Sequence, residues 1–288
     1  ICLATSKERA QVTGTNKTLT GKEIEVSVDW SILPGSEDSW EKVVVSMIDV
    51  TREREIDRMK NEFIATAAHE LRTPLSVLMG YAELLLTDEA EHFTREEKRE
   101  YLHYIFNKGT SLEKLIDDLL DVEKIESGRA LLIEKSQIQL SALIEDLCNN
   151  HQRENKNHSF HLDISDNDIC FLADSDKLNQ VLDNLLTNAV KYSPGGGDII
   201  VVGRVDGDSL FVSVSDQCIG MTETQRKRVF EKFYRADSSN TAPRGLGLGL
   251  NIAKNIIEAH GGKISVESAE HKGTKASFTL PLVDYHQE

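Results

Sequence analysis

The hydrophobic pattern at the start of the chain alternates as it does in β-strands, and then it changes abruptly. Two strand-like runs, KEIEVSVDWSILPG and KVVVSMIDV, lie within residues 22–50 and are separated by the turn signal Pro34-Gly35 and a polar stretch. The next segment, TREREIDRMK, is densely charged and lacks glycine and proline, which favours a helix. Residues 22–50 therefore predict a β-hairpin that passes directly into a helix.

Two long helices are predicted next, over residues 56–87 and 94–125. Apolar residues repeat there at spacings of three and four, which marks one face of each helix. These positions are Ile64, Ala68, Leu71, Leu75, Leu78, Ala82 and Leu85, then Ile105, Leu112, Leu115, Leu119 and Val122. The polar stretch TDEAEHFT joins the helices, which favours an antiparallel hairpin. Each apolar face is too broad for one partner helix, so we expect a homodimer in which two hairpins form a four-helix bundle.

Beyond the break ESG at residues 126–128, strand and helix patterns mix. The predicted strands are HSFHLDIS, DICFLAD, DIIVVGRV, LFVSVSD, ISVESAE and KASFTLPL, and the predicted helices cover residues 141–150, 176–192 and 250–259. This order predicts an α+β domain with a largely antiparallel sheet. The expected domain boundaries are therefore 1–50 for the strands, 51–127 for the helical hairpin and 128–288 for the α+β domain.

Composition narrows the range of partners. A chain of 288 residues is long enough for about two to three domains. Lys and Arg total 33 against 48 for Asp and Glu, and the net charge of -15 argues against nucleic acid as a partner. The cysteines show no CxxC spacing, which favours free thiols over disulfides or a structural zinc site. They are Cys2, Cys148, Cys170 and Cys218.

The expected cellular location rests on the search for membrane-spanning and targeting segments. It has no apolar stretch of about 18 residues and no signal peptide. The chain starts at Ile1 rather than at a methionine and reads as the middle of a longer protein. We therefore expect a cytoplasmic part, and an upstream membrane anchor in the parent protein stays open.

One histidine lies in a distinctive segment of the first long helix, FIATAAHELRTPL. At 100° per residue, His69 falls about 160° from Leu71 on the apolar face, so its ring is expected to face solvent. Thr73 lies one turn further along the same face, and Pro74 removes one helical hydrogen bond beside it. The string HELRTPL resembles the H box of sensor histidine kinases, and the resemblance extends over roughly residues 51–284.

This resemblance implies that His69 is the phosphoacceptor. A histidine must be neutral to attack phosphorus, which the ordinary pKa of about 6.5 for this residue type permits near pH 7. Glu70 is assigned as the general base that accepts the proton from the other ring nitrogen. Thr73 matches the family position that orients a water when the same protein dephosphorylates its partner.

The helix KLNQVLDNLLTNAVKYS carries amides on one face, at Asn184 and Asn188. Mg²⁺ prefers oxygen ligands and keeps several waters, so these two amides together with ATP phosphates would make a sensible shell. Lys191 follows one turn later, where an ammonium can meet a phosphate. The segment resembles the N box of the same family, with Tyr192 at its aromatic position.

Asp216 follows a predicted strand in VSVSDQCIGM, in a turn-like segment that contains Gly220. A carboxylate there can accept the exocyclic amine of adenine, which selects ATP over GTP. The segment resembles the G1 box with one departure, because the family usually has glycine where this chain has Cys218. If that position requires a positive φ, the Cβ adds about 1 to 2 kcal/mol of strain.

Two further segments resemble motifs of the same family. VFEKFYR, with Phe230 and Phe233, resembles the F box, although alone it would read as the end of an amphipathic helix. The polar stretch DSSNTAPR follows as an expected lid, and then come Gly245, Gly247 and Gly249, which resemble the G2 box. These glycines let backbone amides approach phosphates. A Rossmann site needs a strand before them and a Walker loop needs a terminal Gly-Lys-Ser/Thr, and neither is present.

Together the boxes predict an ATP- and Mg²⁺-dependent protein-histidine kinase of a two-component system, with an ATP-binding α+β sandwich of the histidine kinase and Hsp90-like type. No receiver sequence follows the last predicted strand, so a response regulator receiver domain is expected as a partner in trans. The N-terminal strands resemble the end of a PAS sensor domain, with a generic β-hairpin as the alternative. Two other functions stay open: an ATP-hydrolysing conformational machine, against which HELRTPL argues, and a degenerate nucleotide-binding dimerisation module, which only Cys218 favours.

Overall fold

The computed structural model describes residues 9–18, 23–34, 40–87, 93–127, 131–165, 169–235 and 245–282. It divides into two compact units, Ile1–Ala65 and Thr66–Glu288. Three cysteines lie in the described residues, and all three are free, whereas Cys2 lies outside them. No helix in the described ranges is long and apolar enough to cross a membrane.

The first unit contains a three-stranded antiparallel sheet rather than the expected two-stranded hairpin. Its strands, in the order β1-β2-β3, are β1 (Arg9–Lys17), β2 (Glu23–Pro34) and β3 (Trp40–Asp49). The additional strand, β1, has the sequence RAQVTGTNK, in which Val12 is the one large apolar residue, so hydrophobic periodicity gives no signal for it. It is held by backbone pairing with β2, in which Val12 lies opposite Val28.

The sheet passes directly into the first long helix, α1 (Thr51–Leu86), as the sequence predicted. The Asp49 carboxylate accepts hydrogen bonds from the Thr51 backbone N–H at 3.0 Å and from the Thr51 hydroxyl at 2.5 Å. The same hydroxyl accepts from the backbone N–H of Glu25 at 2.8 Å. Thr51 therefore ties the start of α1 to β2 and leaves no flexible linker between strand and helix.

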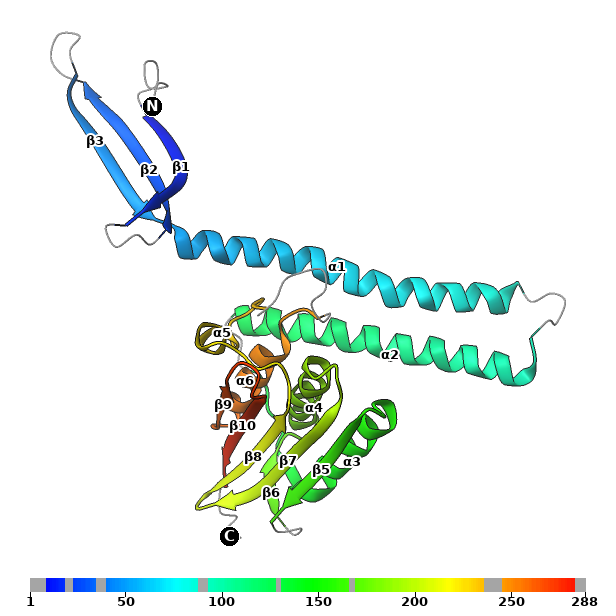
Figure 1. Cartoon of the computed structure of the whole chain (residues 1–288). Helices are drawn as coiled ribbons and strands as arrows, with labels where there is room; N and C mark the ends of the chain where they lie inside the picture. Colours follow the sequence, from blue (N-terminus) through cyan, green and yellow to red (C-terminus); the bar gives the residue numbers. More distant parts are fainter. Residues whose placement is uncertain are drawn as a thin grey trace. The chain divides into compact units, whose positions relative to one another are not determined.

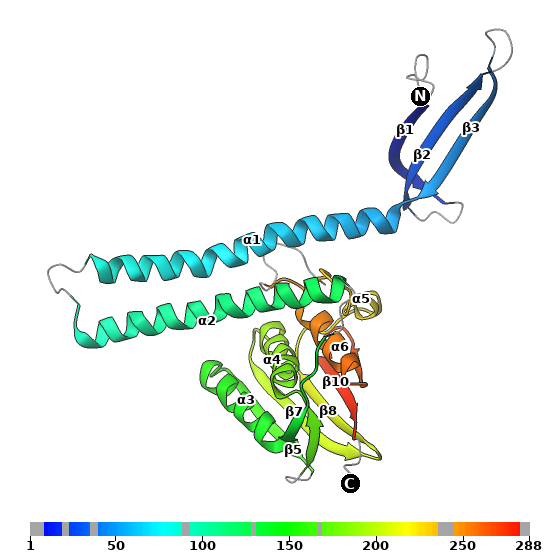
Figure 2. The ribbon, with the colours of Figure 1, turned by 180° about the vertical axis from the view of Figure 1, so that it is seen from behind.

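In the second unit, the later part of α1 and α2 (Arg95–Glu126) form the expected helical hairpin (Figures 1 and 2). The Tyr81 ring of α1 stacks on Tyr104 of α2, with ring centroids 5.1 Å apart. A capping box starts α2: the Thr94 hydroxyl accepts from the Glu97 N–H at 3.2 Å, and Glu97 accepts from the Thr94 N–H at 2.8 Å. Leu71, on the apolar face of α1, is half-buried in the single chain.

The α+β part has a five-stranded sheet in the order β5-β7-β8-β10-β9. All neighbours in it are antiparallel except β5 and β7, so the expected largely antiparallel sheet is confirmed. Its strands are β5 (His158–Ile164), β7 (Gly197–Asp206), β8 (Ser209–Asp216), β9 (Lys263–Ser268) and β10 (Thr274–Pro281). The predicted strand β6 (Cys170–Ala173) pairs instead with a short strand that the sequence analysis missed, β4 (Ser136–Gln139).

Three helices cover one face of this sheet, as Figures 1 and 2 show. They are α3 (Leu140–Glu154), α4 (Ser175–Tyr192) and α6 (Gly249–Ala259), and a short helix, α5 (Glu223–Arg228), follows β8. Alternate residues of β7, Ile199 and Val201, are buried beneath the helices, whereas Ile200 between them is 43% exposed. Leu182 of α4 and Ile252 of α6 belong to the same core, which fixes the two helices that carry the candidate site.

Candidate active site

A cavity of about 350 Å³ lies among α4, the segment after β8, the start of α6 and part of α2. Four of the segments singled out in the sequence meet in its wall, although they are far apart along the chain; VFEKFYR contributes Val229, Tyr234 and Arg235. The predicted residues that line it are Asn184, Asn188, Lys191, Tyr192, Asp216, Gly220, Gly245, Gly247 and Gly249. The expected lid, which falls within residues 236–244, lies outside the described residues.

Asp216 is the last residue of β8 and lines this cavity, and its carboxylate is held by backbone groups. Oδ1 accepts hydrogen bonds from the N–H of Cys218 at 2.9 Å and from the N–H of Thr274 at 3.1 Å. Burial raises the pKa of Asp216 above its ordinary value, although these hydrogen bonds act in the opposite direction. The carboxylate is thus fixed in orientation and only partly solvated.

Cys218 is accommodated without the strain that a positive φ would bring. Among the described non-glycine residues, positive φ occurs at Phe233 and His271, and Cys218 is not one of them. The condition under which this residue would weaken the site is therefore not met. Its side chain is buried, and Sγ lies 3.1 Å from the Thr274 hydroxyl and 3.3 Å from the N–H of Gly220.

Gly220 and Gly247 both need to be glycine for steric reasons. Gly220 has a φ of +69°, and a Cβ there would collide with the Ala269 carbonyl oxygen. Gly247 has a φ of +70°, and its Cβ would lie 2.8 Å from the carbonyl oxygen of Tyr234. These two glycines let the chain turn tightly against its neighbours at the cavity wall.

Lys191 lies near the end of α4 and lines the same cavity as Asp216. A Cβ on Gly245 would lie 2.7 Å from Lys191 Nζ, so the ammonium occupies the space beside this glycine. Nζ is also 4.9 Å from the centre of the Tyr192 ring. Burial and the positive charge of Arg235 lower the pKa of Lys191 to about 8, while the Glu70 carboxylate acts to raise it.

The two candidate metal ligands are placed by the packing of α4 against α6. Asn184 is buried, and its Nδ2 donates to the Gly249 carbonyl at 3.3 Å. Asn188, one turn later, is half-buried on the cavity wall. The described residues contain no cluster of three or more His, Cys, Asp or Glu side chains that could hold a metal ion. Both side chains nevertheless carry amide oxygens of the kind that Mg²⁺ binds, and this ion needs few protein ligands.

Phe230 and Phe233 are not part of the cavity wall as described. The Phe230 carbonyl accepts a hydrogen bond from Nδ2 of the buried Asn251 at 2.9 Å, which attaches this segment to α6. Phe233 has a φ of +63°, an uncommon conformation for an aromatic residue. Sequence reasoning missed Asn251, for which the signal was an amide directly beside the apolar residues Ile252 and Ala253 of the helix.

The three residues of the H box lie on α1 and outside the cavity wall. His69 is exposed, as predicted, and Thr73 donates from its hydroxyl to the His69 carbonyl oxygen at 3.1 Å. Glu70 is half-buried, and its charge acts on Lys191 at the cavity. This interaction connects the segment that carries His69 with the cavity formed by the α+β part.

The hairpin helix α2 also contributes to the cavity wall, through Lys114, Leu115 and Asp118. Burial raises the pKa of Asp118, although a hydrogen bond from Gln180 opposes this. No sequence signal distinguished Lys114 and Asp118 from the polar face of an ordinary helix, and Leu115 was expected only as part of the apolar face. Lys114 also pairs with Asp183 of α4.

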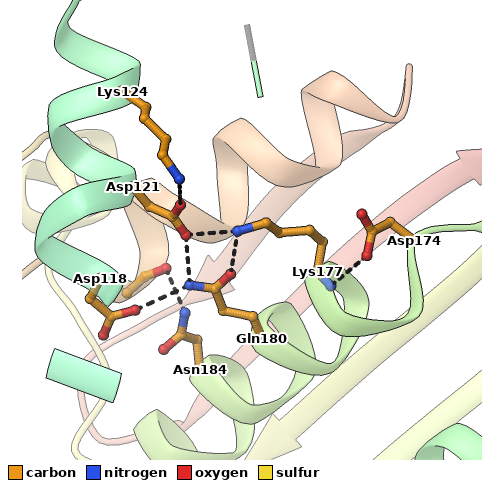
Figure 3. Close-up of polar contacts among 8 residues, drawn as sticks. Asp118, Asp121, Lys124, Asp174, Lys177, Gln180 and Asn184 are labelled. Atoms are coloured by element: carbon orange, nitrogen blue, oxygen red, sulfur yellow. Dashed lines mark hydrogen bonds and ion pairs between the residues drawn. The ribbon is translucent and has the colours of Figure 1, made fainter. Parts of the chain in front are cut away.

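Next to the cavity, a polar cluster joins α2 to α4 (Figure 3). Asp121 is only 4% exposed and accepts from Lys177 Nζ at 2.9 Å and from Gln180 Nε2 at 3.1 Å. Gln180 also donates to Asp118 at 3.2 Å. Burial disfavours ionisation of Asp121, but these hydrogen bonds outweigh it and lower the pKa of the carboxyl. The helix that carries Asn184 is therefore anchored to the hairpin by satisfied buried charges.

Comparison with known proteins agrees with this arrangement. Residues 59–128 match the family described as the His Kinase A (phospho-acceptor) domain. Residues 173–284 match the family described as the histidine kinase-, DNA gyrase B-, and HSP90-like ATPase. The first match contains His69 and the second contains the residues of the cavity wall that lie outside α2.

Relatives with both regions are known. The chain is 32% identical to the sensor histidine kinase WalK of Bacillus subtilis (strain 168) over 91% of this chain and 43% of that protein. It is 35% identical to the sensor protein kinase WalK of Staphylococcus aureus (strain MRSA252) over 81% of this chain and 38% of the relative. The chain thus spans about two fifths of the length of these relatives.

A solved structure of similar fold is full-length ShkA in complex with AMPPNP. It is 27% identical with a TM-score of 0.55, and the match covers 76% of this chain and 45% of ShkA. The phosphoacceptor region, the ATPase region and the similarity to both WalK proteins lead to one assignment. This chain belongs to the sensor histidine kinases.

Proposed function

We propose that this chain binds ATP in the cavity and transfers the γ-phosphoryl group to His69. The observation that carries the proposal is that the separate sequence motifs line one cavity, in the same compact unit that carries the exposed His69. The family match of the ATPase region supports the use of ATP, and the bound AMPPNP of ShkA supports a nucleotide in a site of this fold.

The purine end of the nucleotide is assigned to Asp216. Both backbone N–H groups donate to Oδ1, so Oδ2 is the oxygen proposed to accept the exocyclic amine of adenine. Val214, Val266 and Ala276 line the same cavity and give the ring an apolar surface. A purine that carries a carbonyl in place of the amine would face the carboxylate with a second acceptor, which selects against it.

The phosphate end is assigned to Lys191 and to the segment from Gly245 to Gly249. The Lys191 ammonium supplies a point charge, and the start of α6 supplies backbone N–H groups and the positive end of the helix dipole. Asn184 and Asn188 would hold Mg²⁺ through their amide oxygens. A bound magnesium ion would supply charge neutralisation at the phosphates.

His69 is the proposed nucleophile and Glu70 the proposed general base. The exposed imidazole can approach the γ-phosphorus with one nitrogen, while Glu70 accepts the proton from the other nitrogen as positive charge develops on the ring. Positioning and charge neutralisation would supply most of the rate, as is general for phosphoryl transfer. Thr73 is proposed to orient a water during dephosphorylation of the partner protein.

We further propose that the chain acts as a homodimer through its hairpin. Apolar side chains of both helices are exposed in the single chain, including Leu75 at 46%, Met79 at 62% and Phe106 at 71%. A second hairpin would cover them as a four-helix bundle, and burial of this much apolar surface favours association.

The phosphoryl group is proposed to pass from His69 to an aspartate of a receiver domain in a separate response regulator. ATP and receiver domains are available in the cytoplasm, so a cytoplasmic location is proposed for the catalytic part. Attachment of a longer parent protein to a membrane is compatible with this location. The proposed boundaries are 1–50 for a partial PAS domain, 51–127 for the phosphotransfer hairpin and 128–288 for the ATP-binding domain.

The test is phosphorylation with γ-labelled ATP and Mg²⁺, comparing the chain with His69→Gln. The matched control is His103→Gln, which removes an exposed histidine from the other helix of the hairpin. We expect an acid-labile, base-stable label on the parent and on the control, and none on His69→Gln. Equal labelling of His69→Gln, or the absence of label on a folded and ATP-binding parent, would contradict the proposal.

A further inference from the structure

Cys218 completes a network of hydrogen bonds around the carboxylate assigned to adenine. Its thiol lies 3.1 Å from the Thr274 hydroxyl, and Gly220 donates its N–H to Sγ at 3.3 Å. The Thr274 hydroxyl also lies 2.8 Å from Ser268 Oγ. One side chain thus connects the loop after β8 with the start of β10.

The same residues hold Asp216 through their backbones. The N–H groups of Cys218 and Thr274 donate to the same carboxylate oxygen, Oδ1, at 2.9 and 3.1 Å. Thr274 is bonded to Cys218 through its side chain and to Asp216 through its backbone. A change in the contact between the Cys218 thiol and Thr274 would therefore also change how Thr274 holds the Asp216 carboxylate.

The protonation state of the Cys218 thiol suits it to form these hydrogen bonds. Cys218 is buried, and burial raises the pKa of its thiol, so the group stays protonated at neutral pH. A neutral thiol can donate one weak hydrogen bond while its sulfur accepts another. It can therefore bond Thr274 and Gly220 together, without adding a second negative charge beside Asp216.

We propose that Cys218 is a positioning residue for purine recognition: its thiol holds Thr274 and Gly220 so that the Asp216 carboxylate discriminates a 6-amino purine from a 6-oxo purine. The inference rests on the proposed function, in which Asp216 accepts the adenine amine. Cys218, Asp216, Gly220 and Thr274 all line the cavity.

Discrimination between the two purines requires an acceptor of fixed orientation, and the hydrogen bonds around the Asp216 carboxylate provide that orientation. A carboxylate held at Oδ1 presents its other oxygen to the purine, which favours an amine and repels a carbonyl. A carboxylate that can rotate loses the bond to the amine more often and can also turn away from the carbonyl. Loosening the network should therefore weaken ATP binding more than it changes ITP binding.

The experiment measures the affinities of ATP and ITP by calorimetry on the full chain, its Cys218→Ser and Cys218→Ala variants, and a Cys148→Ala control. Serine keeps a donor and an acceptor, whereas alanine removes both. Cys148 is a buried thiol of α3 that does not line the described cavity, so its loss controls for the removal of a buried sulfur.

We expect Cys218→Ala to lower the ATP-to-ITP preference about tenfold, which corresponds to one lost hydrogen-bonding contribution. Cys218→Ser should keep the preference within about threefold, and Cys148→Ala should leave it unchanged. An unchanged preference in Cys218→Ala would overturn the inference, and so would a serine variant that loses as much as alanine. A parent chain that binds ATP without preference over ITP would instead overturn the assignment of Asp216, and the inference with it.

Discussion

Raising the pH from 7 to 9 should weaken ATP binding by about tenfold, because Lys191 loses its proton in this range. Its pKa of about 8 results from burial and from Arg235, partly offset by Glu70. About nine tenths of the side chain is then charged at pH 7 and about one tenth at pH 9. Only the charged ammonium attracts the phosphates, so affinity should follow this fraction.

The sign of the effect is fixed by linkage. A bound phosphate stabilises the ammonium and raises the pKa of Lys191, so binding above pH 8 must take up a proton. Calorimetric titration of ATP in buffers of different ionisation enthalpy measures both the affinity and this uptake. Removing the opposing carboxylate in Glu70→Gln should move the decline in affinity to lower pH.

Lys191→Arg is the matched control, because an arginine stays protonated across the whole range. Its affinity for ATP should be nearly constant between pH 7 and 9, with little proton uptake. A parent chain with no loss of affinity by pH 9 would contradict a titrating Lys191 at the phosphates. An arginine variant that declines with the same profile would contradict it too, because the titrating group would then be another residue.

Three further perturbations follow from the packing of the site. Gly220→Ala should abolish ATP binding, since its Cβ would collide with a backbone carbonyl, whereas Gly109→Ala meets no atom within 4 Å and should leave calorimetric binding unchanged. Asp121→Ala leaves the Lys177 ammonium without its buried partner and should destabilise the contact between α2 and α4 by about 2 kcal/mol, measured by hydrogen exchange of α4. Asn251→Ala removes the hydrogen bond to the Phe230 carbonyl and should lower the free energy of unfolding in urea by about 1 kcal/mol.

Much of the fold and of the site could be predicted because each depends on local patterns. The long amphipathic helices and the alternating strands were visible as periodicity, and nine of the predicted nucleotide residues line the cavity. The exposure of His69 followed from its angle to the apolar face of α1. These features need only the chain's own spacing, which a single sequence contains.

What the sequence could not reveal depends on packing between distant segments. Lys114 and Asp118 line the cavity only because α2 lies against α4, and no spacing within α2 indicates that contact. Whether Cys218 would strain the backbone depended on its φ angle, which the residue type does not determine. Likewise, β1 is held by backbone pairing with β2, and the sequence of a polar strand gives no hydrophobic pattern that would predict this pairing.

The presence of α2 in the cavity wall has a thermodynamic consequence. Residues of the hairpin and of the α+β part line the same cavity, so nucleotide bound there would be thermodynamically linked to the α2–α4 contact. If making this contact changes nucleotide affinity by a given factor, then nucleotide binding changes the equilibrium of the contact by the same factor. Under the proposed function, the hairpin would then respond to the occupancy of the nucleotide site as well as accept the phosphoryl group.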